Sequence, residues 1–286
     1  FPITFILLFL AGAEPFYLIC ILFFMSFAAG IPLISTFVKL QYDLDQNINF
    51  IMQIYSFISK GYIWLYLIAA FSVFVLALWL FLAKLKIKIS AAYPIILCLS
   101  IILGCAASVP VEKSLKDYQR KRLIVFLNPD IDKRGSGYNL IQSKIAIGSG
   151  RISGKGFRKG TQTQLGFLPE QHTDFIFSVV GEEGGWFISQ LTLLFYFLFI
   201  YRAMTIAKES RDSYGSLLAV GFASMFGIYA VVNIGMSIGI MPIAGMPLLL
   251  LSYGGSSVVS SMCAVGILSS IYMRRYTYYK TSIRIR

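Results

Sequence analysis

Long apolar runs, each close to the length of a membrane-spanning helix, are the feature of this 286-residue sequence that most restricts its fold. A spanning helix takes about 20 predominantly apolar residues. Such runs occur at residues 16–38, 62–83, 91–109, 185–203, 215–241 and 257–273, and residues 1–12 have the composition of a further half-helix. The sequence therefore predicts an all-α polytopic membrane protein, a helical bundle of about six to seven transmembrane helices.

The composition excludes the common soluble classes. Hydrophobic residues make up 57% of the chain and charged residues only 13%, whereas an average soluble domain has about 25% charged residues. The net charge of +12 does not indicate a nucleic-acid-binding protein, because the basic residues lie between the apolar runs. The four cysteines lie in apolar stretches without a CxxC pair, which argues against a disulfide framework or a zinc site.

The basic residues of the connecting segments predict the orientation in the membrane. Eleven of them lie in residues 84–88, in residues 202–211 and in the tail after residue 273, whereas the alternate short connections carry only Lys39 and Lys60. By the positive-inside rule, the C-terminal tail is cytoplasmic and residues 110–173 form a large extracytoplasmic loop. The predicted parts are thus membrane helices in 1–109, the outer loop 110–173, and C-terminal membrane helices with the tail in 174–286.

The outer loop has the composition of an anion-binding segment. It carries twelve basic residues against five acidic ones, and six glycines between residues 148 and 166 alternate with lysine and arginine. Glycine-rich backbone with basic side chains is suited to bind anions, although no Walker motif GxxxxGK[ST] occurs. A solvated linker and a patch for lipid headgroups are the alternative interpretations.

Three carboxylate residues follow this loop in the sequence. Asp174 lies at a loop-to-helix junction at the membrane surface, where an aspartate serves equally well as a helix N-cap or as a proton acceptor. Glu182 and Glu183 lie among glycines inside an apolar stretch. Because a charge at mid-bilayer costs at least about 2.5 kcal/mol, they predict a break near Gly185 that lines a polar cavity.

Two further polar features occur in the C-terminal spans and their connection. Asn233 lies within an apolar span, where a polar side chain typically joins neighbouring helices. Residues 247–257 have the composition of a turn between two spans. The turn returns to the outer face, the same predicted side as Asp174. Two irregular polar segments on one side of the bundle, this turn and the outer segment at Asp174, predict a site between them.

Several of these stretches together resemble the SEDS family of bacterial shape, elongation, division and sporulation proteins. They are QSKIAIGSG from residue 142, GKG from 154, GTQTQLGFLPEQHTDFIFSVVGEE from 160, NIGM from 233 and LSYGGSS from 251. The GTQxQLxF stretch favours the elongation branch over the division branch. The resemblance implies a peptidoglycan glycosyltransferase of the bacterial inner membrane, which polymerises lipid II on the outer face together with a class B penicillin-binding protein.

The resemblance also implies roles for individual residues. Asp174 matches the aspartate that the family needs for activity and would be the catalytic base of an inverting displacement. The departing pyrophosphate would require cations, either basic side chains or a divalent metal such as Mg²⁺ or Mn²⁺. The residues implied to lie near the lipid-linked substrate are Arg120, Arg122, Gln142, Lys144, Lys155, Gln162, Glu170 and His172.

The chain also departs from the family pattern. The Pro-Ser-Glu-x-x-Lys motif of the family's first half does not occur here, so we expect that the family's N-terminal half is missing and that this chain alone has weak or no activity. Residues 16–83 would form an extra hairpin of spans. A flippase for lipid-linked precursors and an inactive scaffold that docks a penicillin-binding protein are alternatives, and a flippase would tolerate Asp174→Asn.

Overall fold

The computed structural model describes residues 2–44, 73, 92–114, 118–119, 122, 125–126, 129–132 and 135–275. All regular elements in these ranges are helical, which confirms the predicted all-α fold. Four of the described helices are long and apolar enough to cross a membrane, and Ala92–Ser108 is a shorter apolar helix. Apart from residue 73, the predicted span 62–83 lies outside the described residues.

The chain divides into two compact units, one of which is Gly12–Ile124. In this unit α2 (Pro15–Leu44) packs against α5 (Ala92–Ser114). A Cβ atom at Gly104 would lie 2.8 Å from the carbonyl oxygen of Phe24, so the close approach of the two helices requires glycine at this position. The rings of Phe16 and Tyr93 pack edge to face, with centroids 4.5 Å apart.

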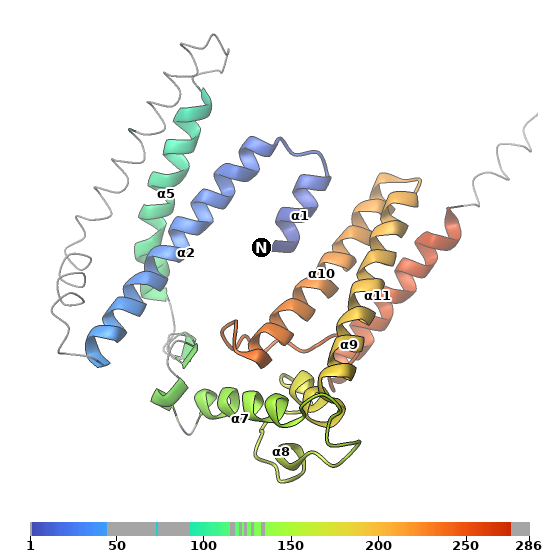
Figure 1. Ribbon diagram of the computed structural model, residues 1–286. Coiled ribbons are helices and arrows are strands. Elements are labelled where there is room, and N and C mark those ends of the chain that lie inside the picture. The colour runs from blue at the N-terminus through green and yellow to red at the C-terminus, as the bar shows by residue number, and fades with distance from the viewer. Residues whose placement is uncertain are drawn as a thin grey trace, which may run out of the picture. The chain divides into compact units, whose positions relative to one another are not determined.

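The second unit contains Phe1–Ala11 and Val125–Arg286. Its long helices α9 (Ile176–Glu209), α10 (Ser213–Ile238) and α11 (Gly255–Arg274) lie side by side, and α1 (Pro2–Leu10) packs against α10 (Figure 1). The helix α7 (Ser136–Ser149) crosses the end at which α9 begins (Figure 1). Two short elements, η1 (Pro129–Asp132) and α8 (Thr161–Gln164), contact α7.

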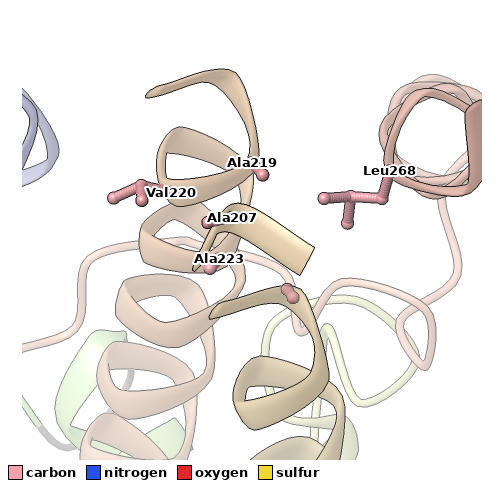
Figure 2. Packing of buried hydrophobic residues seen from close by; sticks show 6 residues of the cluster. Ala207, Ala219, Val220, Ala223 and Leu268 are labelled. Atoms are coloured by element: carbon pink, nitrogen blue, oxygen red, sulfur yellow. The ribbon is translucent and has the colours of Figure 1, made fainter. Parts of the chain in front are cut away.

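Small residues allow the long helices to approach closely. Ala207 of α9 lies beside Ala219 and Ala223 of α10, and Leu268 of α11 points into the same cluster (Figure 2). Such small contacts are typical of membrane helices, which associate through tight packing rather than through a hydrophobic driving force. The outward faces of α9 and α11 are apolar, as a lipid-facing surface requires.

The helix α9 is broken at Gly185, which confirms the predicted interruption. Gly185 has φ 67° and ψ −165°, a backbone conformation that is essentially restricted to glycine. In an unbroken helix the carbonyls of Glu182 and Glu183 would accept from the amides four positions later. They instead accept from the main-chain N–H groups of Lys155 and Gly156, each at 3.0 Å.

The amides on the far side of the break are satisfied by the same loop. Trp186 donates to the carbonyl of Arg151 at 2.9 Å, and Phe187 donates to the carbonyl of Ile152 at 3.3 Å. Residues 151–156 thus supply partners to both ends of the interrupted hydrogen-bond ladder. Irregular backbone at membrane depth is tolerated where protein buries it in this way.

Glycines make this insertion possible. A Cβ atom at Gly150 would overlap the carbonyl oxygen of Gly181, and one at Gly154, whose φ is 75°, would overlap the carbonyl oxygen of Glu183. The glycine-rich composition of the outer loop therefore serves close approach to the chain's own helix at these two positions.

We expect Gly185→Ala to destabilise the fold much more than Gly166→Ala. Both glycines have nearly the same φ, 67° and 68°, but a Cβ at Gly185 would overlap the backbone of Gly154, whereas nothing lies within 4 Å of one at Gly166. The strained backbone and the overlap together should cost about 3 kcal/mol or more at Gly185, and the backbone alone about 1 kcal/mol at Gly166. The free energy of unfolding in detergent micelles checks this, and equal losses would contradict the insertion.

Candidate active site at the start of α9

The segment 172–174, which precedes α9, is held by all three of its main-chain carbonyl groups. In chain order they accept hydrogen bonds from the main-chain N–H of Tyr253, the hydroxyl of Ser252 and Nδ2 of Asn233, at 2.8, 2.6 and 2.8 Å. These donors come from the 247–257 turn and from α10. The two polar segments that the sequence predicted to face one site are therefore in direct contact.

The amide side of the same segment is also fixed. The N–H groups of Thr173, Asp174 and Phe175 all donate to the carbonyl of Glu170, at 3.2, 3.1 and 3.2 Å. Glu170 has φ 59°, which tightens the turn, and its carboxylate accepts the hydroxyl of Thr173 at 2.9 Å. Phe175 occupies the N-cap position of α9, so the half-buried Asp174 is not the N-cap residue.

Asn233 joins three segments, which confirms its interpretation as a polar link between helices. Its Nδ2 donates to the carbonyl of Met246 at 2.7 Å as well as to that of Asp174. The residue is completely buried, and its Oδ1 has no hydrogen-bond partner among the described residues. We refer to Asn233, Ser252 and Tyr253, with the three carbonyls that they bind, as the carbonyl clamp.

A chain of buried hydroxyls attaches α7 to the clamp. The hydroxyl of Ser143 in α7 lies 2.5 Å from that of Ser178 in α9 and donates to the carbonyl of Ser237 in α10 at 2.7 Å. Ser237 in turn donates to the carbonyl of Asn233 at 2.9 Å. All four residues are buried, so these bonds fix the orientation of α7 across the helix ends.

The carboxylate of Glu182 organises the loop that enters the break. It is fully buried and pairs with Nζ of Lys155 at 2.8 Å. It also accepts the main-chain N–H groups of Gln162 and Thr163, at 2.9 and 3.2 Å, and the hydroxyls of Thr161 and Thr163, at 3.2 and 2.6 Å. Glu182 thus neutralises Lys155 and caps α8 from a distant part of the chain.

Three other cations of the outer loop are available at the surface. Arg151, Arg158 and Lys159 are exposed, and within the described ranges none of them forms an ion pair. They therefore supply positive charge that an anionic ligand can meet, whereas the charge of Lys155 is already balanced.

The structure brings together some of the predicted site residues and leaves others apart. Lys144 extends over Gly239 at the C-terminal end of α10, where a cation is favoured. Arg120 lies outside the described residues, and Arg122, near the ring of Tyr118, belongs to the other unit. The remaining predicted residues are placed as follows: Gln142 half-buried on α7, Lys155 and Gln162 at Glu182, and Glu170 and His172 exposed in the turn before Asp174.

The serine contacts that orient this site were not predicted from the sequence. Ser252 was part of a predicted turn, and Ser143 lies in α7, a helix that was not predicted within the outer loop. The SYGGSS and QSK stretches contain these residues, but a hydroxyl that binds a distant carbonyl leaves no local pattern.

Ser252→Ala is expected to lower the free energy of unfolding by about 2 kcal/mol, since it removes a partner from the carbonyl of Thr173 and from the buried N–H of Leu248. The matched control is Ser260→Ala. Ser260 is exposed, and its hydroxyl donates within its own helix to the carbonyl of Ser257 at 3.1 Å. Thermal melting in detergent compares the two, and a loss at Ser252 no larger than at Ser260 would contradict the clamp.

Comparison with known proteins agrees with the motifs. Residues 66–277 match the model of the FtsW/RodA/SpoVE cell cycle protein family. The chain is 48% identical over 169 residues to peptidoglycan glycosyltransferase RodA of Treponema pallidum. The aligned residues cover 59% of this chain and 39% of the relative. The chain is 48% identical over 161 residues to peptidoglycan glycosyltransferase MrdB of Escherichia coli K12, covering 56% and 44%.

Two further matches have lower sequence identity. Stage V sporulation protein E of Bacillus subtilis is 41% identical over 162 residues, covering 57% of this chain and 43% of the relative. A chain in a solved peptidoglycan synthase complex is 32% identical, with a TM-score of 0.49, and the match covers 62% of this chain and 49% of that one. The chain spans about two fifths of the length of the curated relatives that it matches. It belongs to the FtsW/RodA/SpoVE family.

Proposed function

We propose that this chain carries the catalytic aspartate of a peptidoglycan glycosyltransferase that polymerises lipid II, with Asp174 as general base. The observation that carries the proposal is the carbonyl clamp, which together with the amide bonds to Glu170 fixes the backbone of Asp174 and leaves this residue half-buried at the start of α9. A rigidly positioned carboxylate is what general-base catalysis requires. The names of the most similar relatives support the same activity.

The proposed reaction needs little from the protein beyond a base and counter-charge. A sugar hydroxyl of one disaccharide attacks the anomeric carbon of another, and its proton passes to the carboxylate of Asp174. The new glycosidic bond forms as the bond to the lipid pyrophosphate breaks, so the electron pair leaves with the pyrophosphate and the anomeric configuration inverts. A positioned base contributes typically about 10²–10⁴-fold to such a step.

The counter-charge for the departing pyrophosphate is assigned to basic residues of the outer loop. The exposed Arg151, Arg158 and Lys159 are suited to this role in addition to the residues implied by the family resemblance. Within the described residues no three His, Cys, Asp or Glu side chains come together as a metal site. A divalent cation such as Mg²⁺ or Mn²⁺ would be held largely by the phosphates of the substrate, where it would add counter-charge.

We also propose an orientation of the chain in the membrane and a protein partner. The end of the bundle with Asp174 faces the outside, because the opposite helix ends carry Arg202, Lys208 and Arg274, as the positive-inside rule expects of the cytoplasmic face. The C-terminal tail is then cytoplasmic. A class B penicillin-binding protein would be the partner, consistent with the family resemblance.

Fluorescent lipid II distinguishes the proposed enzyme from the alternatives. The purified chain is incubated with lipid II in detergent, with a class B penicillin-binding protein present and with MrdB of Escherichia coli as positive control. Glycan ladders are expected from an enzyme, since no transport step is needed in detergent. Movement of lipid II across liposome membranes without ladders would indicate a flippase. Neither result, with retained binding of the penicillin-binding protein, would indicate a scaffold if ladders are still absent after the part of the family's length that this chain does not span is restored.

A further inference from the structure

A cavity of about 530 Å³ lies at the end of the long helices opposite to Asp174. It is enclosed by the turn between α9 and α10, by the first turns of α10 and by the last turns of α11. Nothing in the proposed glycosyl transfer uses this cavity, and its lining differs from that of the candidate active site.

The polar rim of the cavity is positively charged. Arg211, Arg274 and Arg275 line it, against the single acidic residue Asp212. The carboxylate of Asp212 accepts the N–H of Gly215 at 2.8 Å and so caps α10. Arg275 pairs with Glu209 outside the cavity lining. The lining thus contains more basic than acidic residues, and the exposed positions of Arg211 and Arg274 favour an anionic ligand at this rim.

The inner wall of the cavity is apolar. Leu218 of α10 and Ile267 and Ile271 of α11 form it. The cavity lies where α9 ends, α10 begins and α11 ends, and each of these helices is long and apolar enough to cross a membrane. A ligand that fits has an anionic head at the membrane surface and an apolar tail that follows the helices inward.

An aromatic residue of the rim supports a position of the cavity at the membrane surface. Tyr214, which lines the cavity, is 74% exposed at the start of α10. Tyrosines are enriched at the level of the headgroups, where the ring contacts lipid and the hydroxyl contacts water.

We propose that this cavity binds the phosphate of an anionic phospholipid between Arg211 and Arg274, with the acyl chains along α10 and α11. Basic pockets between transmembrane helices are suited to such headgroups, and each basic residue near the surface strengthens the attraction. The inference is independent of the glycosyltransferase proposal, since it depends on none of the residues near Asp174.

Native mass spectrometry of the purified chain in detergent tests this with added phosphatidylglycerol or phosphatidylcholine. The double variant Arg211→Gln/Arg274→Gln is expected to bind phosphatidylglycerol about 30-fold more weakly than the parent chain. Arg211→Lys/Arg274→Lys retains the charge and should bind nearly as the parent does. The matched control, Arg202→Gln/Lys208→Gln, removes the same charge from exposed residues of α9 that do not line the cavity, and should also bind as the parent does. Thermal melting verifies that each variant is folded.

Three results would overturn the proposal. They are unchanged phosphatidylglycerol binding by the Arg211→Gln/Arg274→Gln variant, equal binding of phosphatidylcholine and phosphatidylglycerol by the parent, and an equal loss in the Arg202→Gln/Lys208→Gln control. Soluble glycerol phosphate is added in competition. If it displaces phosphatidylglycerol at matching concentrations, the site is one for a free phosphate compound, and the lipid assignment is wrong.

Discussion

Asp174→Asn is expected to reduce polymerisation of lipid II at least about 100-fold, because a carboxamide cannot accept the proton of the attacking hydroxyl. The fold should be unaffected, since the clamp binds the main-chain carbonyl of Asp174, which asparagine retains. The rate of glycan formation from fluorescent lipid II measures the loss, and thermal melting verifies that the variant is folded.

Glu183→Gln is the matched control. Glu183 is half-buried, its main-chain carbonyl also holds a loop amide, and its carboxylate has no hydrogen-bond or ion-pair partner in the described part of the chain. We expect its glycan formation to remain near that of the parent chain. Similar losses in the two variants would show that any change of charge at this end of α9 is harmful, and would remove the reason to assign Asp174 as the base.

Glu182→Ala is expected to lower the free energy of unfolding by about 3–5 kcal/mol, the typical result when one partner of a buried ion pair is removed. The variant also removes the acceptor for two amides and two hydroxyls of residues 161–163. Residues 151–164 should then detach from the break at Gly185, and glycan formation should fall with stability.

Lys155→Met separates the charge of the pair from the hydrogen bonds that Glu182 accepts. In this variant Glu182 retains its bonds to residues 161–163, so the loss should be smaller, about 2 kcal/mol. Glu183→Ala serves as the control for a change of the neighbouring carboxylate. Unfolding in mixed detergent micelles measures all three, and a smaller loss for Glu182→Ala than for Lys155→Met would contradict the account of the anchored loop.

The spans and the break were predictable from the sequence because they depend on local composition. The apolar runs that begin at residues 185, 215 and 257 correspond to α9, α10 and α11. The glycines around Glu182 predicted the interruption that the structure places at Gly185. The turn composition of 247–257 and the position of Asp174 on the same predicted side correctly indicated that these two segments meet.

The contacts that orient the site were not predictable, because they join residues far apart in the chain. Glu182 was expected to line a polar cavity, but its partners are Lys155 and the first turn of α8, about 20 residues earlier. Lys155 was predicted to lie near the substrate, and no local pattern indicated that its charge is balanced by Glu182. The helix α7 is short and only moderately apolar, so it gave no membrane signal within the outer loop.

The single-turnover rate at saturating lipid II, measured for the parent and for Asp174→Asn with binding of lipid II determined alongside, tests the central claim most directly. If Asp174 is the base, the variant should bind lipid II nearly as tightly as the parent does, and its chemical step should be slower by at least about 100-fold. An unchanged chemical step, or a loss explained entirely by weaker binding of lipid II, would contradict this assignment.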